Sequence, residues 1–198
     1  MAAEDFDLQQ IHETYRPKIT RYLAGLADDN EAEYLCQEVF SKIHKSLKDY
    51  RAEAGLSTWI YRIATNTFLD RVRSRSFKQQ QKESLSPADE IDSFETDGQP
   101  IDNGKPIIEH QAIRSEMIQC IRGYINQLPE QYRVVLLLSE EEGFKNREIA
   151  DILQISLANV KIRLHRAKAL LKESLKNNCD FYLDDQSEIA CDRKQDCD

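Results

Sequence analysis

One stretch of the chain, residues 81 to 110, interrupts an otherwise continuous helical pattern. It holds three prolines, two glycines and few periodic apolar residues. A segment of this length and composition is too long for a loop inside one compact domain and is typical of a linker. On either side, apolar residues recur at spacings of three and four, as at Leu35, Val39 and Ile43. The sequence therefore predicts an all-α fold, with two small helical domains joined by an acidic flexible linker.

The same pattern gives the boundaries of the expected segments. The first helical domain is predicted to span residues 5 to 80 and the second residues 111 to 176. Residues 177 to 198 follow as an acidic tail that contains cysteines. Glycine and proline are sparse within the two domains, while Leu, Ile, Ala, Glu and Lys are common, and this composition favours helix.

Charge is distributed in alternating blocks, although the whole chain carries a net charge of −8. Residues 42 to 82 hold ten Lys or Arg against three Asp or Glu, and residues 144 to 176 hold eight against three. The segments before, between and after these blocks are acidic. Two basic surfaces are therefore expected in an acidic protein, and each has the charge needed to face phosphate groups.

The second basic block contains "ISLANVKIRLHRAKALL", residues 155 to 171. At about 100° per residue, Val160, Leu164 and Ala167 share one apolar stripe that can pack on the preceding helical segment. Residues 157 to 172 include no acid, so the remaining face is cationic. Two short helices joined by a tight turn fit either a generic helical hairpin or a DNA-binding helix-turn-helix. The charge of one sign favours the second interpretation.

The first domain has a nucleic-acid signal of its own in "LSTWIYRIATNTFLDRVRSRSFK". Aromatic Trp59 and Tyr61 lie close to Asn66 and to several arginines. Rings can stack on unpaired bases, an amide can hydrogen-bond a base edge, and arginines can neutralise phosphates. The structural alternative places Trp59 in the core and leaves the arginines solvated. The preceding segment, "EAEYLCQEVFSKIHKSL", combines acids with apolar residues such as Phe40, which suits docking on a basic partner helix.

Taken in order, these segments resemble the extracytoplasmic function (ECF) group of bacterial RNA polymerase sigma factors. The resemblance covers about residues 8 to 176. It rests on "YRPKITRYLAGLADD", "EAEYLCQEVFSKIHKSL", "LSTWIYRIATNTFLDRVRSR" and "LPEQYRVVLLLSEEEGFKNREIADILQISLANVKIRLHRAKALL". It implies a first domain of the region 2 type and a second of the region 4 type. The implied partners are core RNA polymerase and promoter DNA, with an anti-sigma factor left open, and no catalytic chemistry is implied.

The resemblance also implies roles for individual residues. Docking on the polymerase would involve Glu33, Leu35, Gln37, Glu38 and Phe40. The −10 element would be bound by Arg62, Asn66, Arg71, Arg73 and Arg75, and the loop "RAEAGL" would capture a flipped base. The −35 element would be contacted by Lys161, Ile162, Arg163, His165, Arg166 and Lys168. The linker acids would mimic nucleic acid in the polymerase's RNA-exit path, with a plain acidic spacer as the alternative; they are Asp89, Glu90, Asp92, Glu95, Asp97 and Asp102.

Five cysteines, an odd number scattered along the chain, argue against a secreted disulfide scaffold. The tail holds Cys179, Cys191 and Cys197, whose spacing is not that of a zinc finger. Three thiolates leave a tetrahedral site one ligand short, and Cys120, His110 or a tail Asp could complete it for zinc or monovalent copper. Metal or redox sensing therefore stays open beside a polar tail with incidental cysteines.

Other classes of protein are weighed against the same features. No run of about 18 apolar residues could span a bilayer and the N-terminus is acidic, so we expect a cytoplasmic protein without membrane insertion. A stand-alone helix-turn-helix regulator would bind duplex DNA as a symmetric dimer and would need no second nucleic-acid module. A nucleic-acid enzyme would need clustered carboxylates or His and Cys pairs, whereas the four histidines are scattered.

Overall fold

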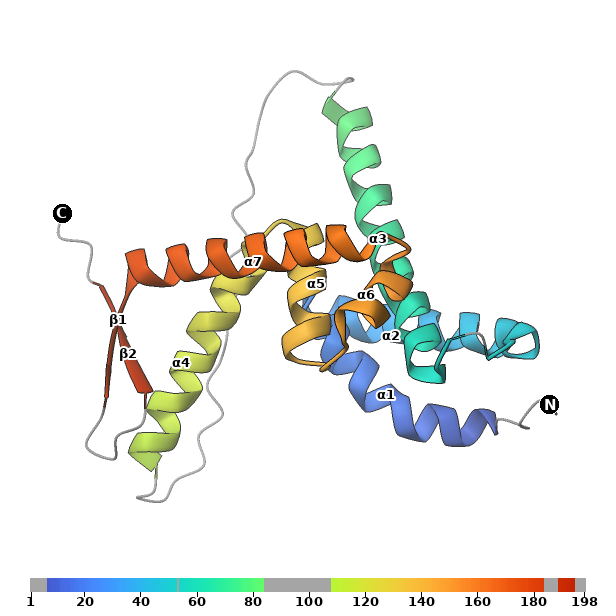
Figure 1. Cartoon of the computed structure of the whole chain (residues 1–198), viewed down its shortest axis with the longest axis horizontal. Helices are drawn as coiled ribbons and strands as arrows, with labels where there is room; N and C mark the ends of the chain where they lie inside the picture. Colours follow the sequence, from blue (N-terminus) through green and yellow to red (C-terminus); the bar gives the residue numbers. More distant parts are fainter. Residues whose placement is uncertain (1–6, 53, 84–107, 184–188, 195–198) are drawn as a thin grey trace.

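The computed structural model describes residues 7–52, 54–83, 108–183 and 189–194. Seven α-helices and a short antiparallel hairpin make up most of these residues (Figure 1). The elements are α1 Leu8–Ala24, α2 Asp29–Ser46, the 3-10 turn η1 Leu47–Asp49, α3 Leu56–Glu83, α4 Ile108–Asn126, α5 Glu130–Glu140, α6 Asn146–Leu153, α7 Leu157–Asn178, β1 Cys179–Leu183 and β2 Ile189–Arg193. The predicted all-α fold is confirmed, and the hairpin is an addition that the helical periodicity did not indicate.

Short polar side chains set the points at which several helices begin. The Asp7 carboxylate accepts a hydrogen bond from the Gln9 amide at 3.0 Å, which caps α1. Asp28 caps α2 and Ser156 caps α7, and each side chain accepts a hydrogen bond from the backbone amide three residues later. Each side chain satisfies a backbone N–H that has no partner within the first turn of its helix. These caps place the start of α7 directly after a turn.

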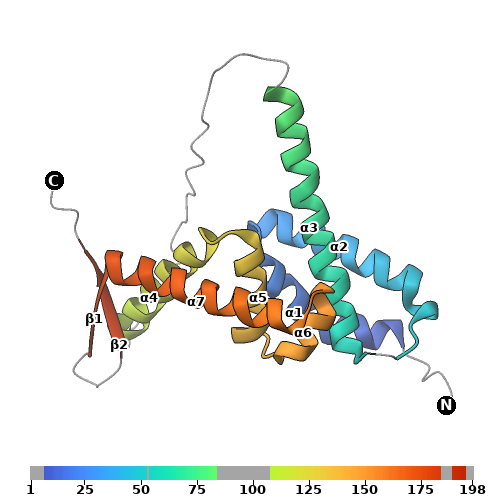
Figure 2. The same cartoon turned by 45° about the horizontal axis from the view of Figure 1, so that its top comes forward.

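The first module consists of α1, α2 and α3, and the second of α4 to α7. In the first module α1 packs on α2, and α2 packs on α3. The C-terminal part of α3 extends away from the other helices (Figure 2). Among the described helices, none combines the length and the apolar composition that crossing a lipid bilayer requires.

The two modules share one hydrophobic core. Buried residues of the first module, including Tyr22 and Ile60, belong to the same cluster as Leu137 and Ile149 of the second. The helices α3 and α6 pack against each other along this boundary. The Leu137 side chain also packs directly on the Gly25 backbone, since a Cβ added at Gly25 would lie 3.0 Å from the Leu137 Cδ1 atom. The two helical domains therefore pack directly against each other in this structure.

A buried carboxylate strengthens the contact between the modules. Glu142, at the end of α5, has a side chain that is only 4% exposed. The Tyr61 hydroxyl on α3 donates a hydrogen bond to it, and the Arg21 Nη2 atom of α1 lies 3.6 Å from its other oxygen. The Tyr61 ring also meets Phe144 edge to face, with centroids 4.8 Å apart. Burial first, and then the nearby Glu142 carboxylate, raise the pKa of Tyr61.

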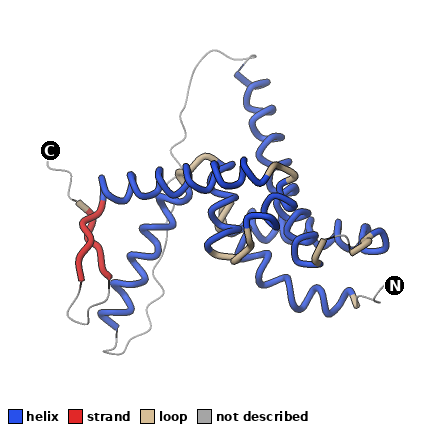
Figure 3. The backbone as a smooth tube through the Cα atoms, in the orientation of Figure 1, coloured by secondary structure: helices blue, strands red, loops and turns tan. Residues whose placement is uncertain are grey.

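The end of the first module and both ends of the second differ from the predicted boundaries by a few residues. The helix α3 continues to Glu83 and α4 begins at Ile108, while residues 84–107, which hold the linker acids, lie outside the described residues. At the other end α7 runs to Asn178, and the strands β1 and β2 follow where a tail was expected (Figure 3). β2 packs on α4, and β1 contacts α7. The hairpin thus closes the second module at the side opposite to α3.

Candidate nucleic-acid interface

The helix-turn-helix predicted from the second basic block is formed by α6 and α7. The helix α6 ends at Gln154, which has a positive φ of 54° and reverses the chain direction. The Ser156 hydroxyl then accepts a hydrogen bond from the Asn159 amide at 3.2 Å. On α7, Val160 and Ala167 are buried, as their stripe in the sequence predicted. The opposite face of α7 is left outside the core.

Most of the side chains predicted to contact the −35 element lie on that outer face. Lys161, His165 and Arg166 are exposed. Ile162 lies among them and is 50% exposed, which is unusual for an apolar side chain of its size. This part of α7 therefore combines cationic groups with one apolar contact, and both can be used in a major groove.

The two remaining predicted residues of α7 are positioned differently. Lys168 is exposed, and its Nζ atom lies 2.8 Å from the Glu140 carboxylate of α5, which lowers the pKa of Glu140. Arg163 is half-buried and lines a groove of about 370 Å³ that Arg73 of α3 also lines. Arg163 therefore faces the first module in this conformation, away from the exposed cationic face of α7.

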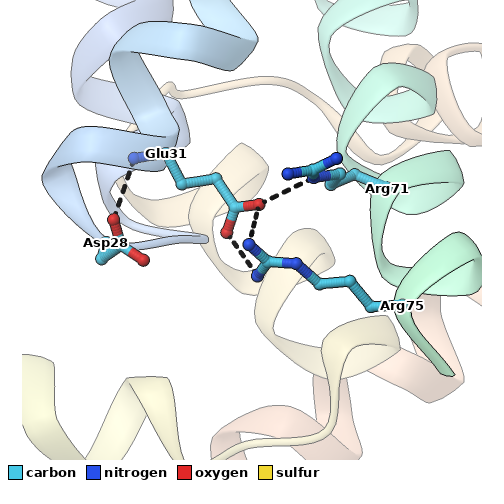
Figure 4. Close-up of polar contacts among 4 residues, drawn as sticks. All are labelled: Asp28, Glu31, Arg71 and Arg75. Atoms are coloured by element: carbon cyan, nitrogen blue, oxygen red, sulfur yellow. Dashed lines mark hydrogen bonds and ion pairs between the residues drawn. The ribbon is translucent and has the colours of Figure 1, made fainter. Parts of the chain in front are cut away.

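On α3, the structure pairs two of the arginines predicted to bind phosphate with a carboxylate of α2. The Arg75 Nη1 atom lies 2.7 Å from Glu31 Oε2, and the Arg75 Nη2 atom lies 2.7 Å from Glu31 Oε1 (Figure 4). The Arg71 Nε atom lies 3.1 Å from the same Oε1 atom. The Glu31 side chain is only 9% exposed, and its backbone amide donates to the Asp28 cap at 2.8 Å. Arg71 also lies over the exposed ring of Tyr34, 5.6 Å from its centroid. A carboxylate of α2 thus neutralises both of these arginines in this conformation.

The other predicted −10 residues lie along the same helix. Asn66 is exposed, and Arg73 lies 3.5 Å from the Asp70 carboxylate in a solvated pair. Arg62 is half-buried, and its Nε atom is buried without a hydrogen-bond partner among the described residues. Buried donors of this kind are normally hydrogen-bonded in folded proteins.

Arg62 lines a cavity of about 470 Å³ beside the loop between η1 and α3. The Tyr50 and Trp59 rings lie 5.1 Å apart at its edge, and the Tyr50 hydroxyl donates to the Ala54 carbonyl at 2.6 Å. The full lining consists of Asp49, Tyr50, Arg51, Ala54, Trp59, Arg62, Asp151 and Gln154. The sequence indicated Trp59, Arg62 and the loop that holds Arg51 and Ala54, but it did not indicate Tyr50. It also missed Asp151 and Gln154, because they come from the other module.

The predicted polymerase-docking residues on α2 are divided between the core and the surface. Gln37 is exposed, Glu33 pairs with Arg16, and Glu38 lies 2.8 Å from the Lys42 Nζ atom. Leu35 is entirely buried in the core in this conformation, so its predicted contact with the polymerase stays a prediction.

Phe40 completes the predicted docking set. It is half-buried and meets the His12 ring at 4.8 Å. Tyr34, which was not among the predicted contacts, is instead 56% exposed on α2. Its exposure on the helix that carries the docking residues adds an aromatic ring to this surface.

The cysteines predicted to bind metal are partly brought together. Cys179 and Cys191 lie on the two strands of the hairpin, and Cys197 lies outside the described residues. Cys120 of α4, one of the residues suggested to complete the site, interacts with Cys179. Over the described ranges, no group of three or more His, Cys, Asp or Glu side chains has an arrangement that could hold a metal ion.

Comparison with known proteins identifies both modules. Residues 11–78 match the family described as Sigma-70 region 2, and residues 118–171 match Sigma-70, region 4. RNA polymerase sigma-H factor of Pseudomonas aeruginosa is 31% identical over 171 residues, which covers 86% of each chain. ECF RNA polymerase sigma factor SigW of Bacillus subtilis is 28% identical over 168 residues, covering 84% of this chain and 88% of its relative.

Solved structures support the same fold. The sigma factor RpoE of Bartonella quintana, solved with the anti-sigma factor NepR, aligns with a TM-score of 0.63 at 20% identity and covers 88% of this chain and 98% of that one. CnrH, solved with the cytosolic domain of CnrY, aligns with a TM-score of 0.55 at 20% identity, covering 85% and 86%. The matches to both regions, in this order and over this much of the chain, show that the protein belongs to the ECF group of RNA polymerase sigma factors.

Proposed function

We propose that this sigma factor directs promoter-specific initiation by using three separate surfaces: the outer face of α2 for core polymerase, α3 with its adjacent cavity for the −10 element, and α7 for the −35 element. One observation above all supports the proposal. A capped helix-turn-helix with a cationic outer face occurs in the same chain as a second basic helix beside an aromatic cavity. A stand-alone helix-turn-helix regulator would have no use for the second surface.

The face of α7 supplies the contacts to the −35 duplex. Arg166, Lys161 and His165 are exposed and can reach phosphates or base edges, and bidentate arginine contacts to guanine are the commonest specific kind. Ile162 provides an apolar contact that suits a thymine methyl group. Phosphate contacts should make binding fall steeply with salt.

The surface of α3 acts on the separated strand of the −10 element. Asn66 supplies an amide for a base edge, and the cavity beside Trp59 and Tyr50 offers rings on which an extruded base can stack. Arg62, whose Nε atom is buried, lines the same cavity. Arg71 and Arg75 reach phosphate only when they exchange the Glu31 carboxylate for it.

Core polymerase docks on the outer face of α2, where Glu33, Gln37, Glu38 and the edge of Phe40 are accessible. Charged residues at the rim of such a contact mainly set the association rate and the salt dependence. The polymerase catalyses the formation of phosphodiester bonds, so the chain contributes no catalytic chemistry of its own. The protein acts where the polymerase is, in the cytoplasm. The acidic linker is proposed to enter the RNA-exit path of the polymerase.

A protein inhibitor is a further proposed partner. The similar sigma factors RpoE and CnrH were solved with the anti-sigma factor NepR and with the cytosolic domain of CnrY. An inhibitor of this kind would act by covering α2, α7 or both.

Transcription with purified core polymerase and a library of promoter fragments tests the function. Added protein should produce transcripts with defined start sites. Arg166→Ala should abolish or shift them, whereas Lys176→Ala, at the far end of α7, should leave the start sites unchanged. If no fragment gives a start site that depends on the protein, the proposed function is refuted.

A further inference from the structure

Three cysteines that are far apart in the sequence lie on the elements that pack together at the hairpin. Cys120 lies on α4, Cys179 begins β1 and Cys191 lies on β2. The strands pair with Cys179 opposite Arg193 and with Phe181 opposite Cys191. Residues opposite each other share a face of the sheet, and so do residues two apart along a strand. Cys179 and Cys191 therefore lie on the same face of the hairpin.

That face brings Cys179 against α4. The side chains of Cys120 and of Tyr124, one helical turn later on α4, both lie within interaction distance of the Cys179 thiol. The packing of β2 on α4 and of α7 on both α4 and β1 brings the start of β1 close to α4. This contact joins the first helix of the second module to the strand that follows its last helix.

The two thiols differ in their access to solvent. Cys179 is 3% exposed, whereas Cys120 is only half-buried. Burial, and after it the neighbouring Cys120, raise the pKa of the Cys179 thiol, so Cys179 stays protonated and is a slow first nucleophile. A small oxidant from solvent therefore meets Cys120 first, and Cys179 lies next to the product.

We propose that Cys120 and Cys179 form a reversible intramolecular disulfide when the protein meets a peroxide. Pairwise sulfur chemistry fits the site better than coordination, because the three cysteines do not have the arrangement of a metal site within the described ranges. This inference depends on the fold of the second module and not on the promoter contacts proposed above.

The steps balance as follows. The Cys120 thiolate attacks one oxygen of the peroxide, the O–O bond breaks, and a sulfenic acid and hydroxide form; the hydroxide takes up the proton that the Cys120 thiol released on ionisation and becomes the first water. The Cys179 sulfur then attacks the sulfenic sulfur of Cys120, the S–O bond breaks, and the hydroxide leaves with the thiol proton as a second water. Two thiols lose two electrons and two protons in total, and hydrogen peroxide is reduced to two waters.

The bond would close a loop that contains α5, α6 and α7. The helix-turn-helix lies inside this loop, and the hairpin would be tied covalently to α4. Oxidation would therefore restrict the second module as a whole and leave the helices of the first module unlinked.

Peroxide treatment of the reduced full-length protein, followed by intact-mass measurement and peptide mapping, tests the proposal. The wild-type chain should lose the mass of two hydrogen atoms and two of its five titratable thiols. Mapping should recover one peptide pair, joined through Cys120 and Cys179, and dithiothreitol should reverse the change. This measurement does not depend on the folding of any variant.

Variants then assign the bond. Cys120→Ser and Cys179→Ser should each abolish it, whereas Cys36→Ser, which changes a buried cysteine of the first module, should retain it. The proposal is overturned if no thiols are lost, if the bond links two chains, or if the wild-type pair includes Cys191 or Cys197. It is equally overturned if the purified protein releases zinc when its thiols are modified, because the sulfurs would then be ligands.

Discussion

Replacing Glu31 with glutamine tests how much the carboxylate between α2 and α3 contributes to stability. Gln has the same shape but carries no charge, so Glu31→Gln removes a two-pronged pair with Arg75 and a third contact with Arg71. Hydrogen bonds to charged groups typically contribute about 1.5–3 kcal/mol each. The two guanidinium groups are about half exposed and can be rehydrated, so the whole set should contribute less than the sum.

We expect Glu31→Gln to lower the free energy of unfolding by about 2 kcal/mol. For a chain of this length, that corresponds to a fall in Tm of roughly 4–8 °C, measured by circular dichroism. The matched control is Asp70→Asn, which removes an exposed pair with Arg73 on the same helix. It should change the free energy of unfolding by less than about 0.5 kcal/mol.

The same variant should change DNA binding in the opposite direction. Without the Glu31 carboxylate, Arg71 and Arg75 are available to phosphates. Polymerase that carries the variant should bind the single-stranded −10 sequence more tightly, with a salt slope that is steeper by about 0.7 for each phosphate gained. If Glu31→Gln and Asp70→Asn lower Tm equally, burial does not strengthen the Glu31 pair and the reasoning is refuted.

Four further outcomes are expected. Arg166→Ala should weaken binding of the −35 duplex by the polymerase complex roughly 5- to 150-fold, corresponding to about 1–3 kcal/mol, by fluorescence anisotropy; an unchanged affinity would exclude Arg166 from the interface. Gly25→Ala should lower the free energy of unfolding in urea by about 1–3 kcal/mol, because its Cβ would lie 3.0 Å from a leucine methyl group of α5. Leu35→Ala should destabilise the chain by about 2–5 kcal/mol, whereas Glu38→Gln should leave stability within about 0.5 kcal/mol and weaken only polymerase binding. Burial raises the pKa of Tyr22 above its ordinary 10.0, so the folded chain keeps a proton that the unfolded chain releases. The free energy of unfolding should therefore fall as pH rises above about 10, and Tyr22→Phe should reduce that fall.

Local patterns in the sequence were sufficient to predict the helices and the helix-turn-helix. The apolar stripe of Val160 and Ala167 depends only on the helical repeat, and the Ser156 cap depends on groups three residues apart. The exposed cationic face of α7 follows from the same geometry, because burying one stripe leaves the others outside.

Contacts between distant residues were not predictable in this way. Nothing near Arg75 in the sequence indicates that Glu31 will neutralise it, and nothing near Leu35 distinguishes a docking residue from a core residue on a helix with two apolar sides. The lining of the cavity also depends on contacts between distant residues, since Asp151 and Gln154 reach it only through the packing of α6 on α3. The hairpin was missed because each of its strands is only five residues long, and because its pairing joins residues that are separated in the sequence, such as Cys179 and Arg193.

The shared core makes the folding of the two modules cooperative. Tyr61 and Leu137 are buried by residues of the other module as well as of their own, so any state in which the modules part must rehydrate these surfaces and the Glu142 carboxylate. A target that binds only the separated modules must supply this free energy of rehydration, so its apparent affinity is lowered accordingly. It also predicts a single calorimetric unfolding transition, and a loss of stability in each module when it is expressed without the other.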